Sequence, residues 1–159
     1  MQVQYLIKDS KCGGKGMFAN EIIQAGTCIW KYDNTANVIE YDEAASKEYL
    51  KELHKKSLFE AQNFLDLTFG KGDKLVFITD DGRYFNHSDT PNCRTDIETG
   101  HTYTKVDIKV GDELFDNYET FSHPPFLFEM LDLYQCMPTY YNISNTTGEQ
   151  KCRPMETDY

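Results

Sequence analysis

The stretch RYFNHSDTPN, residues 83–92, places side chains that can bind a polar ligand beside two aromatic rings. Arg83 supplies a guanidinium, Asn86 an amide and His87 an imidazole. Surface loops seldom combine rings suited to burial with so many hydrogen-bonding groups, which favours a binding site. A turn whose Asn and Ser side chains bond their own backbone is the alternative, and the stretch by itself leaves both interpretations open.

Two further segments carry weaker signals when each is taken alone. The glycines of GGKGMFA let the backbone approach a ligand closely, but they also suit a tight β-turn, and no helix follows as a dinucleotide-binding motif requires. The segment GDELFDNYETF places Tyr118 at the end of a predicted strand, where a tyrosine is usually an ordinary edge residue. The order of all three segments is therefore more informative than any one of them.

A glycine-rich turn after the first strand, then NHSxxPN, then ELxxxY resembles the SET-domain family of protein lysine methyltransferases over about residues 3–121. The resemblance implies a mostly β fold with short helices (α+β), in which small curved sheets surround a pseudoknot of the NHS and ELxxxY segments. It also implies transfer of methyl groups from S-adenosylmethionine to the side-chain amine of lysine in a protein, with histones as one candidate and S-adenosylhomocysteine as the product.

The resemblance also implies roles for individual residues. The loop whose backbone holds the cofactor corresponds to Gly14, Lys15, Gly16 and Met17. Arg83, Asn86 and His87 match the middle cofactor motif, whose Asn–His pair meets the methionine part and the adenine. Tyr118 matches the tyrosine whose hydroxyl lies beside the transferred methyl, so it is both a catalytic and a cofactor-binding candidate. Tyr32 matches the tyrosine that lines the lysine channel.

The chemistry of methyl transfer is compatible with these residue types. Transfer from a sulfonium to an amine is an in-line displacement that needs a neutral lysine, a dry narrow channel and oxygen atoms around the methyl. Burial beside a cationic sulfonium lowers the pKa of the lysine through desolvation and like-charge repulsion, so no strong base is required. A site built from tyrosine, amide and backbone groups, without paired carboxylates, fits this requirement.

The chain departs from many family members at the zinc-binding positions. The cysteine that often follows NHS is Asp89 here, and only Cys136 and Cys152 follow the last motif, so we predict no zinc and no metal ligands. We expect Phe121, as a further cofactor-contacting residue, and a helix over 126–134 to close the channel instead. A helix that only covers the core is an equally good interpretation of that pattern.

A second departure leaves the reaction product open. Asp116 stands two residues before Tyr118, where the family often has the Phe or Tyr that tunes how many methyls are added, so mono-, di- and trimethylation all remain possible outcomes. The altered motif also supports a rival interpretation, a catalytically silent SET-like module that binds a peptide or protein partner. The intact glycine loop, NHSDTPN and Tyr118 argue against that module. A third alternative is an enzyme that methylates a small amine.

The hydrophobic pattern predicts the elements that position these residues. Alternation in VQYLIKD and HTYTKVDIKV predicts strands, and so does the β-branched and aromatic content of KLVFITD. Helical periodicity with N-caps at Asp42 and Ser57 predicts a helical insert over about 42–66 that breaks and restarts. We accordingly divide the chain into a SET domain, 1–121, and a C-terminal helix with an irregular tail, 122–159, which completes the active site.

Charge and cysteine content narrow the classes of partner and compartment. A net charge of −10 in 159 residues argues against direct binding of nucleic acid and favours a basic lysine-containing protein or peptide as substrate, although acidity that serves only solubility is the alternative. Five cysteines without a CxxC pair favour free thiols in a reducing compartment. The sequence shows no signal segment and no membrane-spanning run, so we expect an intracellular protein, cytoplasmic or nuclear, that does not bind membranes. The sequence leaves its oligomeric state open.

Overall fold

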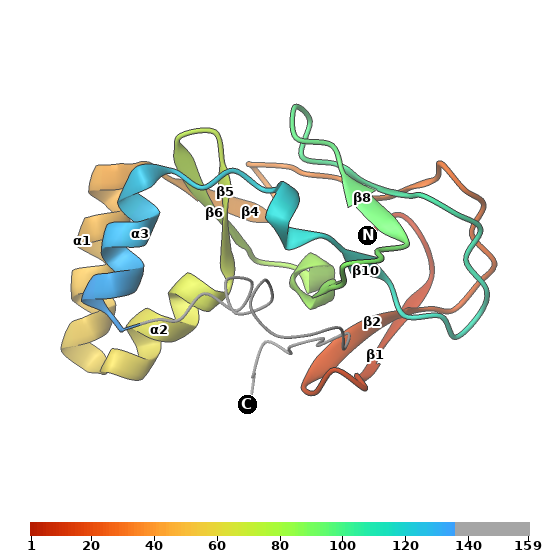
Figure 1. Cartoon of the computed structure of the whole chain (residues 1–159), viewed down its shortest axis with the longest axis horizontal. Coiled ribbons are helices and arrows are strands. Elements are labelled where there is room, and N and C mark those ends of the chain that lie inside the picture. Colours follow the sequence, from red (N-terminus) through yellow and green to blue (C-terminus); the bar gives the residue numbers. More distant parts are fainter. Residues whose placement is uncertain (136–159) are drawn as a thin grey trace. The chain divides into compact units, whose positions relative to one another are not determined.

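Small β-sheets and α-helices make up residues 1–135, the part of the chain that the computed structural model describes (Figure 1). These residues form two units. The first unit holds Met1–Tyr32 and Asp80–Thr120, and the second holds Asp33–Thr79 together with the described residues from Phe121 onward. The prediction of a mixed α+β fold with several small sheets is confirmed.

The first unit consists of short strands and two 3-10 turns. Its elements are β1 (Tyr5–Asp9), β2 (Lys15–Ala19), β3 (Cys28–Trp30), η1 (Asp81–Tyr84), β7 (Asn86–His87), β8 (Cys93–Thr95), β9 (Thr102–Thr104), β10 (Phe115–Asp116) and η2 (Tyr118–Thr120). Strands β1 and β2 form an antiparallel hairpin, and β3, β9 and β8 form an antiparallel sheet in that order. The remaining pair, β7 and β10, is parallel.

The pairing of β7 with β10 brings the NHS segment beside the ELFDNY segment, as the resemblance implied. Only two residue pairs form this ladder, Asn86 with Phe115 and His87 with Asp116. The Asn92 side chain reinforces it, because its Nδ2 donates to the Glu113 carbonyl at 2.7 Å and its Oδ1 accepts from the Phe115 amide at 2.8 Å. A parallel ladder this short gains little by itself, so the side-chain bonds of Asn92 are an integral part of the pairing.

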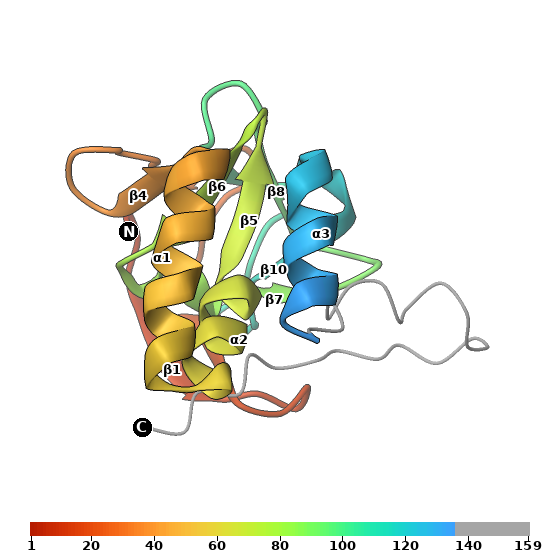
Figure 2. The same cartoon turned by 90° about the vertical axis from the view of Figure 1, so that its left-hand side faces the viewer.

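The second unit packs three helices against one antiparallel sheet. The sheet has the order β4 (Val38–Tyr41), β6 (Lys74–Ile78), β5 (Thr68–Lys71), and the helices are α1 (Glu43–Lys56), α2 (Leu58–Asp66) and α3 (Pro125–Leu133). Figure 2 shows the helices on one side of this sheet. The core between them is formed by Leu50, Leu53, Ala61, Phe64, Leu65, Leu75, Phe126, Leu127, Met130, Leu131 and Tyr134.

The helix starts follow from local capping chemistry. The Asp42 carboxylate accepts from the Ala45 amide at 2.8 Å, and the Ser57 hydroxyl accepts from the Glu60 amide at 3.1 Å. Each bond satisfies one backbone donor that a helix N-terminus leaves without an intrahelical partner. Both predicted caps are confirmed, and so is the break between the two helices at Ser57. The predicted C-terminal helix is present one residue earlier than expected, because Pro125 occupies its first turn.

The thiol prediction is only partly right. Cys28 and Cys93 are free, but Cys12 is disulfide-bonded, so the expectation of free cysteines is wrong at that position. An odd cysteine count without a CxxC pair cannot exclude a disulfide between residues distant in sequence.

Among the described residues, no helix is both long enough and apolar enough to cross a membrane.

Replacement of Asp42 tests the contribution of the α1 cap. We expect Asp42→Ala to lower the free energy of unfolding by about 1 kcal/mol, because the Ala45 amide loses its acceptor. The measurement is urea denaturation followed by circular dichroism. Asp42→Asn retains a side-chain oxygen and should stay close to the parent protein; equal losses in both variants would show that the cap bond is not the cause.

Candidate functional site

The Glu113 carboxylate connects the three sequence motifs inside the first unit. Its Oε2 accepts from the Ser10 hydroxyl at 3.0 Å, and its Oε1 accepts from Nδ2 of Asn86 at 2.8 Å. Ser10 also closes the glycine-rich turn, since its carbonyl accepts from the Gly13 amide and its own amide donates to the Gly14 carbonyl. One carboxylate therefore fixes the glycine turn and the NHS segment relative to the ELFDNY segment.

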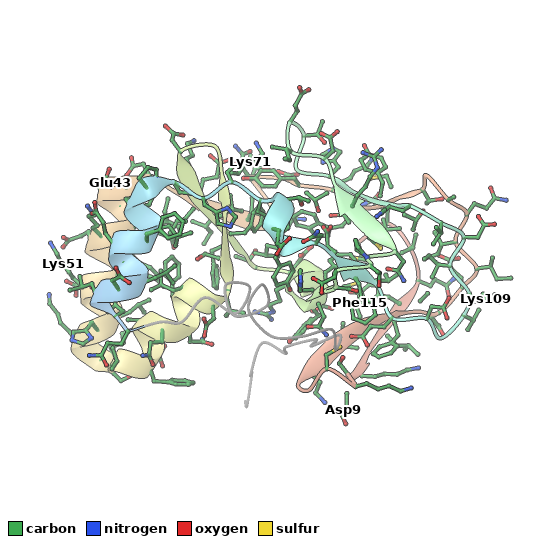
Figure 3. The ribbon with its side chains drawn as sticks, viewed as in Figure 1. Asp9, Glu43, Lys51, Lys71, Lys109 and Phe115 are labelled. Atoms are coloured by element: carbon green, nitrogen blue, oxygen red, sulfur yellow. The ribbon has the colours of Figure 1, made fainter. Side chains whose placement is uncertain are left out.

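The absence of a side chain at Gly16 is required by this arrangement. A Cβ at Gly16 would lie 2.1 Å from Oε1 of Glu113 and 3.0 Å from Nδ2 of Asn86, so a side chain here would force the Glu113 carboxylate to move. The neighbouring Lys15 side chain pairs instead with Asp9 at 2.5 Å, at the exposed end of the β1–β2 hairpin where Figure 3 labels Asp9. Gly16 thus allows the β2 backbone to lie directly against the Glu113–Asn86 bond.

Two members of the predicted loop contribute backbone rather than side-chain groups. Gly14 is exposed and adopts a positive φ of 59°, and Met17 buries its side chain fully in the core. The Met17 carbonyl accepts from the Leu114 amide at 2.8 Å, which adds a second tie between β2 and the ELFDNY segment. Any polar ligand at this loop would therefore meet its main chain.

Asn86 has a fixed orientation. Its Nδ2 donates to the Lys15 carbonyl at 3.1 Å and to Glu113, so both amide hydrogens are used within the protein. Its Oδ1 makes no hydrogen bond with any residue that the structure describes. Asn86 can therefore act toward a ligand only as an acceptor, which suits an ammonium group.

His87 uses both of its ring nitrogens internally. Nδ1 accepts from the Tyr118 amide at 3.1 Å, and Nε2 lies 3.2 Å from Oδ1 of Asp89. An acceptor at Nδ1 places the proton of the neutral ring on Nε2, which donates to Asp89. The imidazole, only 4% exposed, holds the backbone of Tyr118 rather than presenting a nitrogen to a ligand.

Tyr118 presents a neutral phenol. Its hydroxyl donates to the Phe85 carbonyl, and its ring lies 5.3 Å from the His87 ring between centroids. Burial raises the pKa of Tyr118 well above its usual value, and the nearby Asp116 carboxylate raises it further. The hydroxyl consequently stays protonated at neutral pH and does not remove a proton from another group.

Asp116 is a buried carboxylate beside this site, with 3% of its surface exposed. It accepts from the Thr95 hydroxyl and, at 2.8 Å, from the Asn117 amide. Burial nevertheless raises the pKa of Asp116 above its usual value, because these two bonds only partly replace the water that an ionised carboxylate would have. Burial, with a further contribution from Asp116, also raises the pKa of the Cys93 thiol to about 12.

Arg83 carries a buried donor that the protein does not satisfy. Its Nε has no hydrogen-bond partner among the described residues, and its guanidinium lies 5.3 Å from the centroid of the Tyr84 ring. The 3-10 turn η1 that carries Arg83 is anchored, because Asp80 accepts from the Gly82 amide and from Nε1 of Trp30. An unsatisfied, positively charged donor on a fixed turn can bind an anionic group such as a carboxylate.

The two remaining predicted residues are placed as follows. Tyr32 belongs to the first unit, where its amide donates to Nδ1 of His101 at 3.1 Å and its ring packs so closely on Gly100 that a Cβ there would lie 2.6 Å from it. Phe121 belongs to the second unit, with its ring centroid 4.7 Å from that of Phe69.

The described residues contain no group of three or more His, Cys, Asp or Glu that could hold a metal ion.

Sequence reasoning missed the connecting residues of the site. Glu113 stood out only as one of several acidic residues near Tyr118, and Ser10 was not identified at all. No sequence signal marked either residue, because a hydrogen bond between side chains 103 positions apart leaves no local pattern.

Asp116→Asn tests the cost of the buried carboxylate. The folded protein binds the Asp116 proton more tightly than the unfolded chain does, so this stabilising contribution is present at acid pH and is lost as the pH rises through the raised folded-state pKa. The free energy of unfolding of the parent, relative to Asp116→Asn, should therefore fall as the pH rises above about 4, the pKa of an unfolded Asp. Urea denaturation across this range measures it, and a difference independent of pH would contradict the assignment.

Comparison with protein families matches the chain to the SET domain over residues 14–119, which is more than half of the sequence. The matched region begins in the glycine turn and ends just after Tyr118, so it contains all three motifs. A search of curated proteins found no match.

Solved structures share the fold. One is the crystal structure of a Plasmodium falciparum protein described as a "putative histone methyltransferase", with a TM-score of 0.51 and 21% identity, covering 74% of this chain and 95% of that one. Another is a humanized mutant of the Chaetomium thermophilum Polycomb Repressive Complex 2 bound to an inhibitor, with a TM-score of 0.53 and 22% identity, covering 77% of this chain but 16% of that one. At these identities the likeness shows the fold, which confirms the SET fold that the motifs implied. Together with the family match, it establishes that the chain belongs to the SET-domain family.

Proposed function

We propose that the protein is an S-adenosylmethionine-dependent protein-lysine N-methyltransferase. SET domains use this cofactor and are typically protein-lysine methyltransferases. The observation that carries the proposal is the direct bonding of the three motifs within one unit, with Asn86 bound to Lys15 and Glu113, and His87 bound to Tyr118. Within this arrangement the Oδ1 of Asn86 and the Nε of Arg83 remain available for a ligand, which supports a cofactor site.

The chemistry of the donor set fits the methionine part of the cofactor, which has an ammonium and a carboxylate. Asn86 offers an amide oxygen as its only remaining polar atom, which suits the ammonium. Arg83 offers an unsatisfied charged donor, which suits the carboxylate. His87 would contribute through its main chain, because both ring nitrogens are already used.

The backbone of the glycine loop completes the proposed binding site. The glycine loop comprises Gly14, Lys15, Gly16 and Met17. The loop is held in place by the Ser10–Glu113 bond. The role predicted for Phe121 stays a prediction, since the residue belongs to the second unit.

The bound cofactor supplies a methyl group on a positively charged sulfonium. Around it the protein would provide neutral oxygen atoms, because the raised pKa of Tyr118 keeps its hydroxyl protonated. We assign Tyr118 to the methyl-transfer centre and Tyr32 to the wall of the lysine channel. The target lysine would lose its proton to solvent before transfer. Tyr118 would not accept this proton, because its own hydroxyl stays protonated at neutral pH.

The proposed substrate is a basic, lysine-containing protein segment. A net charge of −10 raises the concentration of cationic segments near the surface. Histone tails are one such class, and other Lys-rich proteins are equally suited by charge. No zinc is part of the proposal.

Incubation with methyl-labelled S-adenosylmethionine tests the function. The purified protein is mixed with histones and with cell extract, and labelled lysines are identified by peptide mass spectrometry, with Asn86→Ala as a control. Label on lysine that disappears in the variant supports the proposal. Calorimetry with S-adenosylmethionine is run alongside, because absence of both label and cofactor binding would favour the catalytically silent module.

Tyr118→Phe separates turnover from cofactor binding. The variant loses the hydroxyl that donates to the Phe85 carbonyl, so we expect kcat to fall at least about tenfold while the cofactor Kd changes less than about threefold. Single-turnover kinetics and calorimetry measure the two quantities. A normal kcat would remove Tyr118 from the reaction centre.

Gly16→Ala should damage the cofactor site specifically. Its added Cβ would displace Glu113 from Asn86, and we expect the Kd for S-adenosylmethionine to rise at least about tenfold by calorimetry. Gly26→Ala is the matched control, because its Cβ would meet no atom within 4 Å and only its positive φ is strained. The control should lose some stability and keep its cofactor affinity. Equal affinity losses in the two variants would contradict this explanation.

A further inference from the structure

We propose that Asp89 is a positioning residue that acts through His87 to hold Tyr118 in place. The position is the one at which many family members carry a zinc-binding cysteine, and the carboxylate here does something different. Its Oδ1 lies 3.2 Å from Nε2 of His87, and Nδ1 of the same ring accepts from the Tyr118 amide at 3.1 Å. The catalytic consequence rests on the function proposed above; the hydrogen-bond relay does not.

The relay depends on the tautomer of His87. The Tyr118 amide can donate only to an unprotonated Nδ1, so the neutral ring must carry its proton on Nε2. Asp89 accepts at that nitrogen and therefore favours this tautomer over the other. In the opposite tautomer, a protonated Nδ1 would face the Tyr118 amide as a second donor, and the bond would be lost.

Burial makes the Asp89 contact important for the ring. His87 is only 4% exposed, and Asp89 is the acceptor that its Nε2 meets. An unsatisfied buried donor is unfavourable enough to shift a ring between tautomers or to rotate it. Removal of the Asp89 carboxylate should therefore change the protonation of Nδ1 and the hydrogen bond that the Tyr118 amide donates to it.

Asp89 can be replaced without disturbing the turn that carries it. Its side chain is 54% exposed, and the hydrogen bond to His87 is its contact with the buried part of the unit. The turn is held by other bonds, since the Thr90 amide donates to the Ser88 hydroxyl at 3.1 Å and the Ser88 amide donates to the Asp116 carbonyl at 2.9 Å. A variant at position 89 thus changes the relay while the fold is kept.

Tyr118 is held at both of its ends. The amide bonds to His87, and the hydroxyl bonds to the Phe85 carbonyl. Loss of the amide bond frees the start of the 3-10 turn η2 at Tyr118 and lets the ring move. Because small misplacements of a reacting group reduce rates steeply, we expect kcat to fall about tenfold in Asp89→Ala, with the KM for S-adenosylmethionine changed less than about twofold.

Nitrogen-15 NMR of the histidines tests the relay without any need for activity. The chain has four histidines, so the ring signals of His87 can be assigned by replacing the other three one at a time. We expect the Nε2-protonated tautomer in the parent protein and in Asp89→Asn, which keeps an acceptor oxygen. Asp89→Ala should show a mixture of tautomers and an upfield shift of the Tyr118 amide proton. Kinetics on the same three proteins give the kcat and KM values.

The outcomes distinguish this inference from the proposed function. A changed His87 tautomer and a lowered kcat in Asp89→Ala, both restored in Asp89→Asn, support it. An unchanged tautomer and Tyr118 amide in Asp89→Ala overturn it, even if the parent protein is an active methyltransferase. If the parent is inactive while the tautomer responds, the relay stands and the methyltransferase proposal fails. Asp89→Asn as slow as Asp89→Ala would also overturn the inference.

Discussion

A carboxylate that is partly buried away from water needs hydrogen-bond donors from the protein, and in the first unit Glu113 has such donors. Its two oxygens accept from Ser10 and Asn86, which belong to different motifs. Gly16 lies so close to this pair that a side chain at this position would displace the Glu113 carboxylate. The local positions of the glycine turn, the NHS segment and the ELFDNY segment therefore depend on one partly buried group, and the proposed cofactor site depends on all three.

The two acidic residues of the ELFDNY segment lie in different surroundings. Glu113 accepts from a serine hydroxyl and an asparagine amide, whereas Asp116 is deeply buried and burial raises its pKa. Burial, with a smaller contribution from Asp116, raises the pKa of Tyr118 further above neutral pH, so its hydroxyl stays protonated. An ionisable group, Asp116, thus lies close to Tyr118, the residue assigned above to the proposed reaction centre.

Local chemistry made parts of the structure predictable. Asp42 and Ser57 cap their helices because a cap needs only a short side chain and an amide three residues later, both visible in sequence. The meeting of the NHS and ELFDNY segments was expected from the family resemblance and not from periodicity, and the register of Asn86 with Phe115 came only from the structure. The Ser10–Glu113 and Asp89–His87 bonds were missed because side-chain contacts leave no periodic signal. Cys12 was assigned wrongly for the same reason.

The bonds of the site join residues far apart along the chain. Ser10 and Glu113 are separated by 103 positions, and Asn86 and Lys15 by 71. Closing such long loops is entropically unfavourable and is compensated only when several distant contacts form together. During synthesis, the glycine turn leaves the ribosome long before its acceptor exists. The proposed cofactor site therefore cannot assemble on a nascent chain until Glu113 has emerged, so any cofactor would bind only after almost the whole domain has been made.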